Sequence, residues 1–108
     1  MKSKAVIDAG ICGFQTIVEA ICEDCQNVSI KIDTTCKTIK SFAHNIEGKQ
    51  IDAYQEISKN NDSVIFTAAH VCTGCCKGCI VPVGIFKVLQ VAAGLALPKD
   101  VAIKITKD

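Results

Sequence analysis

Four thiols stand within eight residues of this chain, at Cys72, Cys75, Cys76 and Cys79, and we call them the 72–79 cluster. A long apolar segment typical of a helix follows the cluster directly. At a helix N-terminus, backbone N–H groups without partners and the positive end of the helix dipole favour thiolate over thiol. Thiolates bind metal ions, hold iron–sulfur clusters and exchange disulfides, so the cluster indicates one of these three chemistries.

The spacing inside the cluster suits a metal site that is completed from elsewhere. Cys72 and Cys75 are separated by two residues, as are Cys76 and Cys79, and this gap lets both sulfurs of a pair reach one ion. Neighbouring side chains point in different directions, so we do not expect Cys75 and Cys76 to bind the same ion. One or two thiolates from other segments are therefore needed to complete a tetrahedral shell of four sulfurs.

Two other cysteines are placed to supply those thiolates. Cys12 precedes Gly13 in a predicted turn between two strands, and Cys36 stands at the start of a predicted helix. If the first strands form a meander, this turn and this helix start fall at the same end of the sheet. We therefore predict that Cys12 and Cys36 bind the cofactor together with the metal-binding cysteines of the 72–79 cluster.

The remaining candidate site residues could have a structural role instead of a functional one. Cys22 and Cys25 form a second C-x-x-C, but Cys22 falls on the apolar face of a strand, where cysteine commonly acts as a small buried hydrophobe. The role of Cys25 stays open. His70 could add a nitrogen ligand or be structural, and Lys77 could lower the pKa of the thiols or simply be solvated.

Composition limits the class of protein. The 108 residues are 49% apolar, which suits a single cysteine-rich domain spanning residues 1–108. The net charge is +1 without a basic stripe, so we expect no nucleic-acid partner. Eight cysteines in a chain without a secretory apolar region indicate a reducing, cytoplasmic location, where metal or redox roles are commoner than disulfide frameworks.

The longest apolar segment does not require a membrane. It runs from Ile80 to Leu97, and Pro82, Lys87 and Gln90 interrupt it. A buried amphipathic helix explains this pattern more simply than a membrane span does. We therefore expect no membrane partner.

Periodicity predicts the order of the elements. Alternation of apolar and polar residues indicates strands, and helical spacing from Cys36 indicates a helix capped by Thr34 or Thr35. The predicted strands are 5–9, 14–23, 27–33 and 101–105, the predicted helices 36–46, 51–58 and 78–94, with an ambiguous stretch at 64–71 and a polar loop at 59–63. Segregated strands and helices in the order β-β-β-α-α-α-β predict an α+β fold, with a mostly antiparallel sheet and helices on one face.

Several of these residues together resemble the iron–sulfur cluster scaffold proteins of the IscU/NifU type. The matching features are Cys12-Gly13, Thr34-Thr35-Cys36, Gly48-Lys49 and a cysteine ahead of the late helix. The resemblance implies an IscU-like fold, an iron–sulfur cluster and a protein partner in cluster or sulfur transfer. This chain differs in having Phe14 where the scaffolds have Asp, four late cysteines where they have one, and a last predicted strand.

The chain also resembles small uncharacterised cysteine-rich proteins of strict anaerobes and methanogens, which implies an anaerobic host but no activity. We find no Gly-rich phosphate loop, Ser-His-Asp signal or recognisable carboxylate pair, so we do not expect an enzyme. The leading hypothesis is a small protein that binds zinc or an iron–sulfur cluster as a scaffold, carrier or electron-transfer protein.

Two alternatives stay open. One is a thiol–disulfide or persulfide-handling protein that uses Cys72 and Cys75, or Cys22 and Cys25, as the exchanging pair. The other is a structural module whose loop is stapled by zinc or a disulfide. The sequence does not choose between these alternatives, nor between a monomer and a homodimer.

Overall fold

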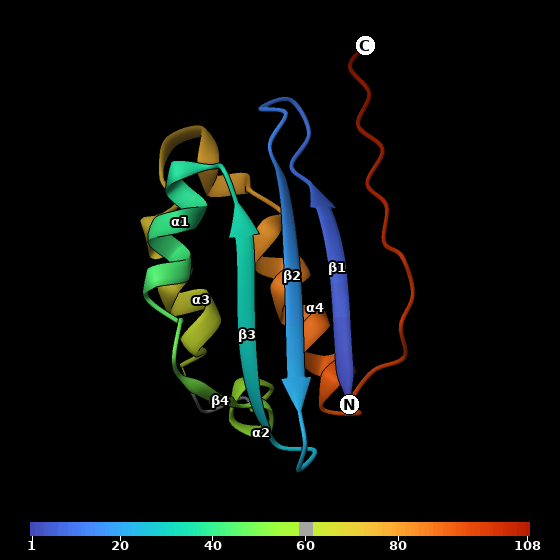
Figure 1. Cartoon of the computed structure of the whole chain (residues 1–108). Coiled ribbons are helices and arrows are strands. Elements are labelled where there is room, and N and C mark those ends of the chain that lie inside the picture. The colour runs from blue at the N-terminus through green and yellow to red at the C-terminus, as the bar shows by residue number, and fades with distance from the viewer. Residues whose placement is uncertain (59–61) are drawn as a thin grey trace.

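A four-stranded antiparallel sheet in the order β1-β2-β3-β4 forms the centre of the computed structural model, which describes residues 1–58 and 62–108 (Figure 1). The strands are β1 (Lys2–Asp8), β2 (Gln15–Cys22), β3 (Asn27–Thr34) and β4 (Gln50–Asp52). The predicted α+β fold with an antiparallel sheet is confirmed.

The two central strands owe their pairing to the alternation in their sequences. In β2, Thr16, Val18 and Ala20 are buried while the residues between them are half-buried or exposed. Val18 pairs with Ile32 and Ala20 with Ile30 across the β2–β3 ladder. Because successive side chains point to opposite faces, this register collects the apolar residues on one face of the sheet.

Helices cover that apolar face. They are α1 (Lys37–His44), α2 (Ala53–Glu56), α3 (Val64–Ala68), the 3₁₀ helices η1 (Ala69–Val71) and η2 (Gly74–Gly78), and α4 (Val81–Ala92). In Figure 1, α4 runs behind β1 and β2 from the end where η2 lies toward the N-terminus of the chain. The stretch from Val64 to Val71, ambiguous in sequence, is therefore helical.

The core lies between the sheet and the helices α1, α3 and α4. Val81, Ile85, Leu89 and Ala92 recur at helical spacing and are buried, so α4 presents one apolar stripe to the strands. The largest side chains of the core that are fully buried are Phe42, Ile39, Ile46, Ile51, Ile65, Ile85 and Leu89. Gly84 allows α4 to lie close to β1, because a Cβ built on Gly84 would lie 2.6 Å from the Cδ1 atom of Ile7 on β1.

One helical stretch of the described residues, Gly74–Ala92 (19 residues), is long and apolar enough to cross a membrane by length and composition. It reaches that length only by joining η2 to α4, and α4 itself has 12 residues with a buried apolar stripe. The radius of gyration is 13.6 Å, close to the value of about 13 Å expected for a globular chain of this length. Within this stretch, α4 is the part that packs into the core.

The predicted order of elements is wrong in two places. Residues 101–105 form no strand, although their apolar residues alternate as in a strand. The fourth strand is instead β4, which overlaps the start of the predicted helix 51–58. Ile51 pairs with Val28, and the carboxylate of Asp52 then accepts N–H bonds from Tyr54 and Gln55, which starts the short α2.

Helix starts also differ from their predicted positions. Cys36, not Thr34 or Thr35, is the N-cap residue of α1, because the hydroxyl oxygen of Thr34 accepts the Cys36 N–H at 3.2 Å. The late helix α4 begins at Val81 and not near Gly78, since the preceding residues form a 3₁₀ helix. The greater part of the predicted polar loop, residues 59–61, lies outside the described residues.

Candidate functional site

Three segments that carry cysteines meet at one end of the sheet, which we call the thiol end. They are the β1–β2 turn, the residues that start α1, and the chain from the end of η1 to the start of α4. Figure 1 shows all three at the end of the sheet where β1 and β3 finish. The meander places the first turn and the start of α1 together, as the sequence analysis expected.

Cys12 lies at the tip of the β1–β2 turn and is exposed. The turn is closed by hydrogen bonds from the Gly13 N–H to the Gly10 carbonyl (2.9 Å) and from the Ala9 N–H to the Phe14 carbonyl (3.1 Å). Gly10 and Gly13 have φ values of +91° and +76°, which a residue with a Cβ rarely adopts. Both glycines therefore serve the turn that presents Cys12 to solvent.

Cys36 is half-buried at the start of α1. Its thiol makes no capping hydrogen bond, and its carbonyl accepts the first helical N–H from Lys40 at 2.9 Å. Thr34 holds this position, because its hydroxyl contacts both the Cys36 N–H and the buried Thr16 hydroxyl, the latter at 3.0 Å. A pair of buried threonines thus fixes the backbone that carries Cys36, and the sequence analysis did not assign them this role.

The four thiols of the 72–79 cluster differ in exposure. Cys72 is buried, Cys76 and Cys79 are half-buried, and Cys75 is exposed. The Cys76 sulfur lies 4.0 Å from the Thr38 hydroxyl on α1, which brings the cluster against that helix. Neighbouring side chains Cys75 and Cys76 therefore have different surroundings, in line with their different predicted directions.

Cys79 stands just ahead of α4, where the helix N-terminus offers backbone donors. The Val81 N–H donates to its sulfur, which favours the thiolate and lowers the pKa. The pKa of Cys79 is nonetheless raised above its ordinary value, first because the thiol is buried and then because thiolates at Cys36, Cys12 and Cys76 repel its negative charge. The helix N-terminus alone therefore does not make Cys79 a ready thiolate.

The pKa of Cys72 is raised in the same way. Burial is the main cause, followed by repulsion from thiolates at Cys79, Cys76 and Cys36, while Lys77 lowers it slightly. Thiols of all three segments, including Cys12, thus contribute to the raised pKa values of Cys72 and Cys79.

The thiols gather without forming a closed metal shell. Within residues 1–58 and 62–108, no three His, Cys, Asp or Glu side chains are arranged closely enough to hold one ion. His70 is exposed and joins no such group among these residues. All eight cysteines are free thiols. The donor chemistry suits a soft metal, but the side chains would have to move to bind one.

The second C-x-x-C lies at the opposite end of the sheet. Thr16 pairs with Thr34 near the thiol end, whereas Cys22 pairs with Val28 at the far end of the same ladder. At about 3.3 Å per residue, the two ends of this ladder are about 20 Å apart. Cys22 is buried and Cys25 is exposed in the β2–β3 turn, so neither can join the thiols at the other end.

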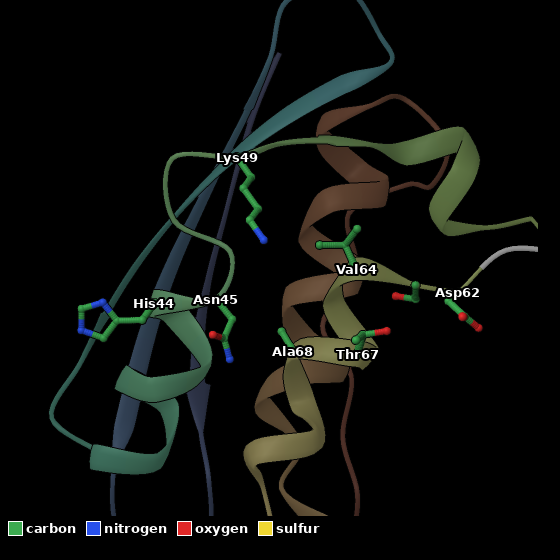
Figure 2. A pocket seen from close by; sticks show the side chains of 8 residues that line it. His44, Asn45, Lys49, Asp62, Val64, Thr67 and Ala68 are labelled. Atoms are coloured by element: carbon green, nitrogen blue, oxygen red, sulfur yellow. The ribbon is translucent and has the colours of Figure 1, made fainter.

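A pocket of about 490 Å³ lies away from every cysteine, between the end of α1 and α3 (Figure 2). His44 and Lys49 line one side and Asp62 and Thr67 the other, with His44 turning its ring away from α3. The Ser63 hydroxyl in its wall donates to the Glu56 carboxylate. The Ser63 hydroxyl is therefore engaged with Glu56 and is not a free nucleophile in this pocket.

Comparison with known proteins supplies a family but no activity. A family model described as a family of unknown function, DUF6951, matches residues 3–105. The chain belongs to the DUF6951 family. No curated protein and no solved structure matches the chain significantly. The matched range covers all of the sheet except Lys2, covers the thiol end, and extends to Ile105 in the C-terminal segment.

Proposed function

We propose that this DUF6951 chain binds a transition-metal ion or an iron–sulfur cluster at the thiol end, as a scaffold, carrier or electron-transfer protein. The observation that carries the proposal is the arrival of thiols from three separate segments at one end of the sheet. Unrelated buried cysteines have no reason to meet in this way. A protein with a single reactive thiol would not need Cys12 and Cys36. A zinc ion or disulfide that only fixes the loop of the 72–79 cluster would not need them either.

The donor set suits zinc or an iron–sulfur cluster. Thiolates are soft ligands that select these groups over the hard cations Mg²⁺ and Ca²⁺. The half-buried or buried thiols Cys36, Cys72, Cys76 and Cys79 would form the inner donors, and the exposed Cys12 would approach from its turn. Cys75 faces solvent and is the weakest candidate of the 72–79 cluster.

Electrostatics supports a cation here. Burial and neighbouring thiolates raise the pKa values of Cys72 and Cys79, so these two thiols resist losing their protons. A bound cation reverses that repulsion, because it attracts every thiolate that surrounds it. Closing the shell requires side-chain rotation on the β1–β2 turn and on η2, both of which lie outside the sheet ladders.

The experiment is to purify the chain without oxygen and to measure zinc, iron and acid-labile sulfide per chain, together with the absorption spectrum. About one ion or one cluster per chain is expected, with sulfur-to-iron charge-transfer absorption if the group is an iron–sulfur cluster. Cys76→Ser should lower the loading strongly, whereas Cys25→Ser, which changes an exposed cysteine at the opposite end, should not.

Substoichiometric metal in the unchanged protein, even after reconstitution with zinc or with iron and sulfide, contradicts the proposal. Equal loading of the Cys76→Ser and unchanged proteins would place the metal elsewhere. A circular dichroism spectrum of each metal-free variant shows whether a loss of loading reflects a loss of fold.

Thiol exchange is a second candidate, because exposed Cys75 lies beside half-buried thiols that could resolve a mixed disulfide. The buried Cys72 with its raised pKa fits poorly as the attacking thiol. Alkylation of the metal-free protein near neutral pH distinguishes the two functions. One cysteine that reacts much faster than the others supports exchange, and slow reaction of all eight counts against it.

The resemblance to IscU/NifU-type scaffolds and the eight free thiols suggest the cellular location, the partner and the host of this protein. A reducing cytoplasm keeps the thiols available for metal. A protein that supplies or accepts a cluster or sulfur would be the partner, and an anaerobic host would protect an exposed cluster from oxygen.

A further inference from the structure

The C-terminal segment, residues 98–108, is extended and carries alternating apolar residues, yet it forms no strand. Leu97 before it is 89% exposed, and Val101, Ile103 and Ile105 are 57%, 68% and 87% exposed. The three residues alternate with Ala102 and Lys104, which is the pattern of a strand with one apolar face. Exposed alternating residues of this kind indicate a strand whose partner is missing.

An open strand edge is available to receive it. β1 is the first strand in the order β1-β2-β3-β4, so one of its sides pairs with no other described strand. α4 lies over β1, and Val91, on the same side of α4 as Gly84, is only half-buried. Apolar side chains of a strand added outside β1 would therefore meet an apolar flank of α4. An edge of this kind is a known site of pairing between chains.

The segment does not occupy this edge in its own chain. Figure 1 shows it running beside β1 in the same direction as β1, and no residue from 98 to 108 pairs with a described strand. Every ladder in this sheet is antiparallel, and antiparallel pairs are slightly more stable per residue than parallel ones. A second chain can present the segment in the antiparallel direction.

We propose that residues 101–105 add as an antiparallel fifth strand to β1 of a second copy of this chain, and that two copies exchange these strands reciprocally. In this exchange the β1 edge of each copy receives the C-terminal strand of the other copy, which gives a closed two-fold dimer. The occupant of the β1 edge is thus the C-terminal segment of the same protein.

An antiparallel register that pairs Ile103 with Ile7 suits both the shape and the charge of the two strands. It places Ile103 opposite Ile7 and Ile105 opposite Ala5, on the face that α4 covers. On the outer face it places Thr106 opposite Lys4 and Asp108 opposite Lys2, so an acidic residue faces a basic one. Shifting the segment by two residues toward its own C-terminus places Lys104 opposite Lys4, and like charges in directly opposite positions are unfavourable.

The first test measures the mass of the full chain in solution by sedimentation or light scattering over a range of micromolar concentrations. A dimer is expected for the unchanged protein. Ile103→Lys should be monomeric because it places a charge on the covered face. Ala102→Lys adds the same charge to the outer face, opposite Asp8, and should stay dimeric.

The second test locates the strand. A dimer mixed from isotope-labelled and unlabelled chains should show NMR contacts between Ile103 of one chain and Ile7 of the other. The amide protons of alternate residues in 101–105, which pair with β1, should exchange slowly in the dimer. A monomeric unchanged protein overturns the proposal, as does a dimer that Ile103→Lys leaves intact. Contacts between Ile103 and Ile7 within one chain overturn it equally.

Discussion

At the scale of single residues, the surroundings of each thiol separate cysteines that the sequence spaces alike. Cys75 and Cys76 are neighbours, yet Cys75 faces solvent and Cys76 lies against Thr38 of α1. Cys22 and Cys72 both open a C-x-x-C and both are buried, but only Cys72 lies among other thiols. The function of a cysteine here thus depends on which segments surround it.

The raised pKa values of Cys72 and Cys79 predict how stability changes with pH in the metal-free protein. Their folded-state pKa exceeds the ordinary thiol value of 9.0, so the folded chain holds protons that the unfolded chain releases. Stability should therefore be full below the ordinary pKa and fall as the pH rises through it. Urea unfolding at pH 7.5 and pH 9.5, under reducing conditions, measures this change.

Variants assign the pH effect to the thiol end. Cys72→Ala removes one of the two titrating groups and should flatten the fall in the urea midpoint. Cys25→Ser, an exposed cysteine at the opposite end, should leave the fall unchanged. A midpoint that rises between the two pH values, or an equal fall in Cys72→Ala, would contradict the assignment.

At the scale of elements, the sequence predicts well where alternation and burial agree. Val28 and Ile30 alternate with polar residues, and both are buried in β3 as expected. Prediction fails where the formation of a strand depends on which other segment lies beside it. Ile51 joins a strand because Val28 is there to pair with it, whereas Val101 to Ile105 find no partner within their own chain. Local periodicity reports which face is apolar, but not whether that face is covered.

The contact between α4 and β1 gives a test of the element packing. A methyl group at residue 84 would lie 2.6 Å from the Ile7 Cδ1 atom, so Gly84→Ala should cost about 1 kcal/mol despite its better helix propensity. Ile7→Val removes that Cδ1 atom, at a cost of about 1 kcal/mol.

The double variant decides between a steric and a conformational effect. With Cδ1 gone, the nearest atom of residue 7 is Cγ1 at 3.2 Å, so Gly84→Ala should cost less in the Ile7→Val background, as urea unfolding of the four proteins would show. If Gly84→Ala is equally costly in both backgrounds, the close approach of α4 and β1 through this glycine is wrong.

At the scale of the whole molecule, the meander makes one end of the sheet differ from the other. It carries Cys12 and Cys36 to the end where α4 begins, and it carries Cys22 and Cys25 to the far end. The sequence predicts this gathering, because a turn and a helix start two strands apart must share an end. The sequence could not predict that these thiols do not form a closed metal-binding shell, since that depends on side-chain directions set by packing.

The central claim is that the three segments serve one site, and metal loading of single variants tests it most directly. Cys12→Ser, Cys36→Ser and Cys76→Ser change one thiol in each segment, and Cys25→Ser is the control. Zinc, iron and sulfide per chain would be measured after anaerobic reconstitution of folded protein. We expect all three variants to lose affinity for the metal while the control keeps it. Full loading of both Cys12→Ser and Cys36→Ser would contradict the claim and leave a site local to the 72–79 cluster.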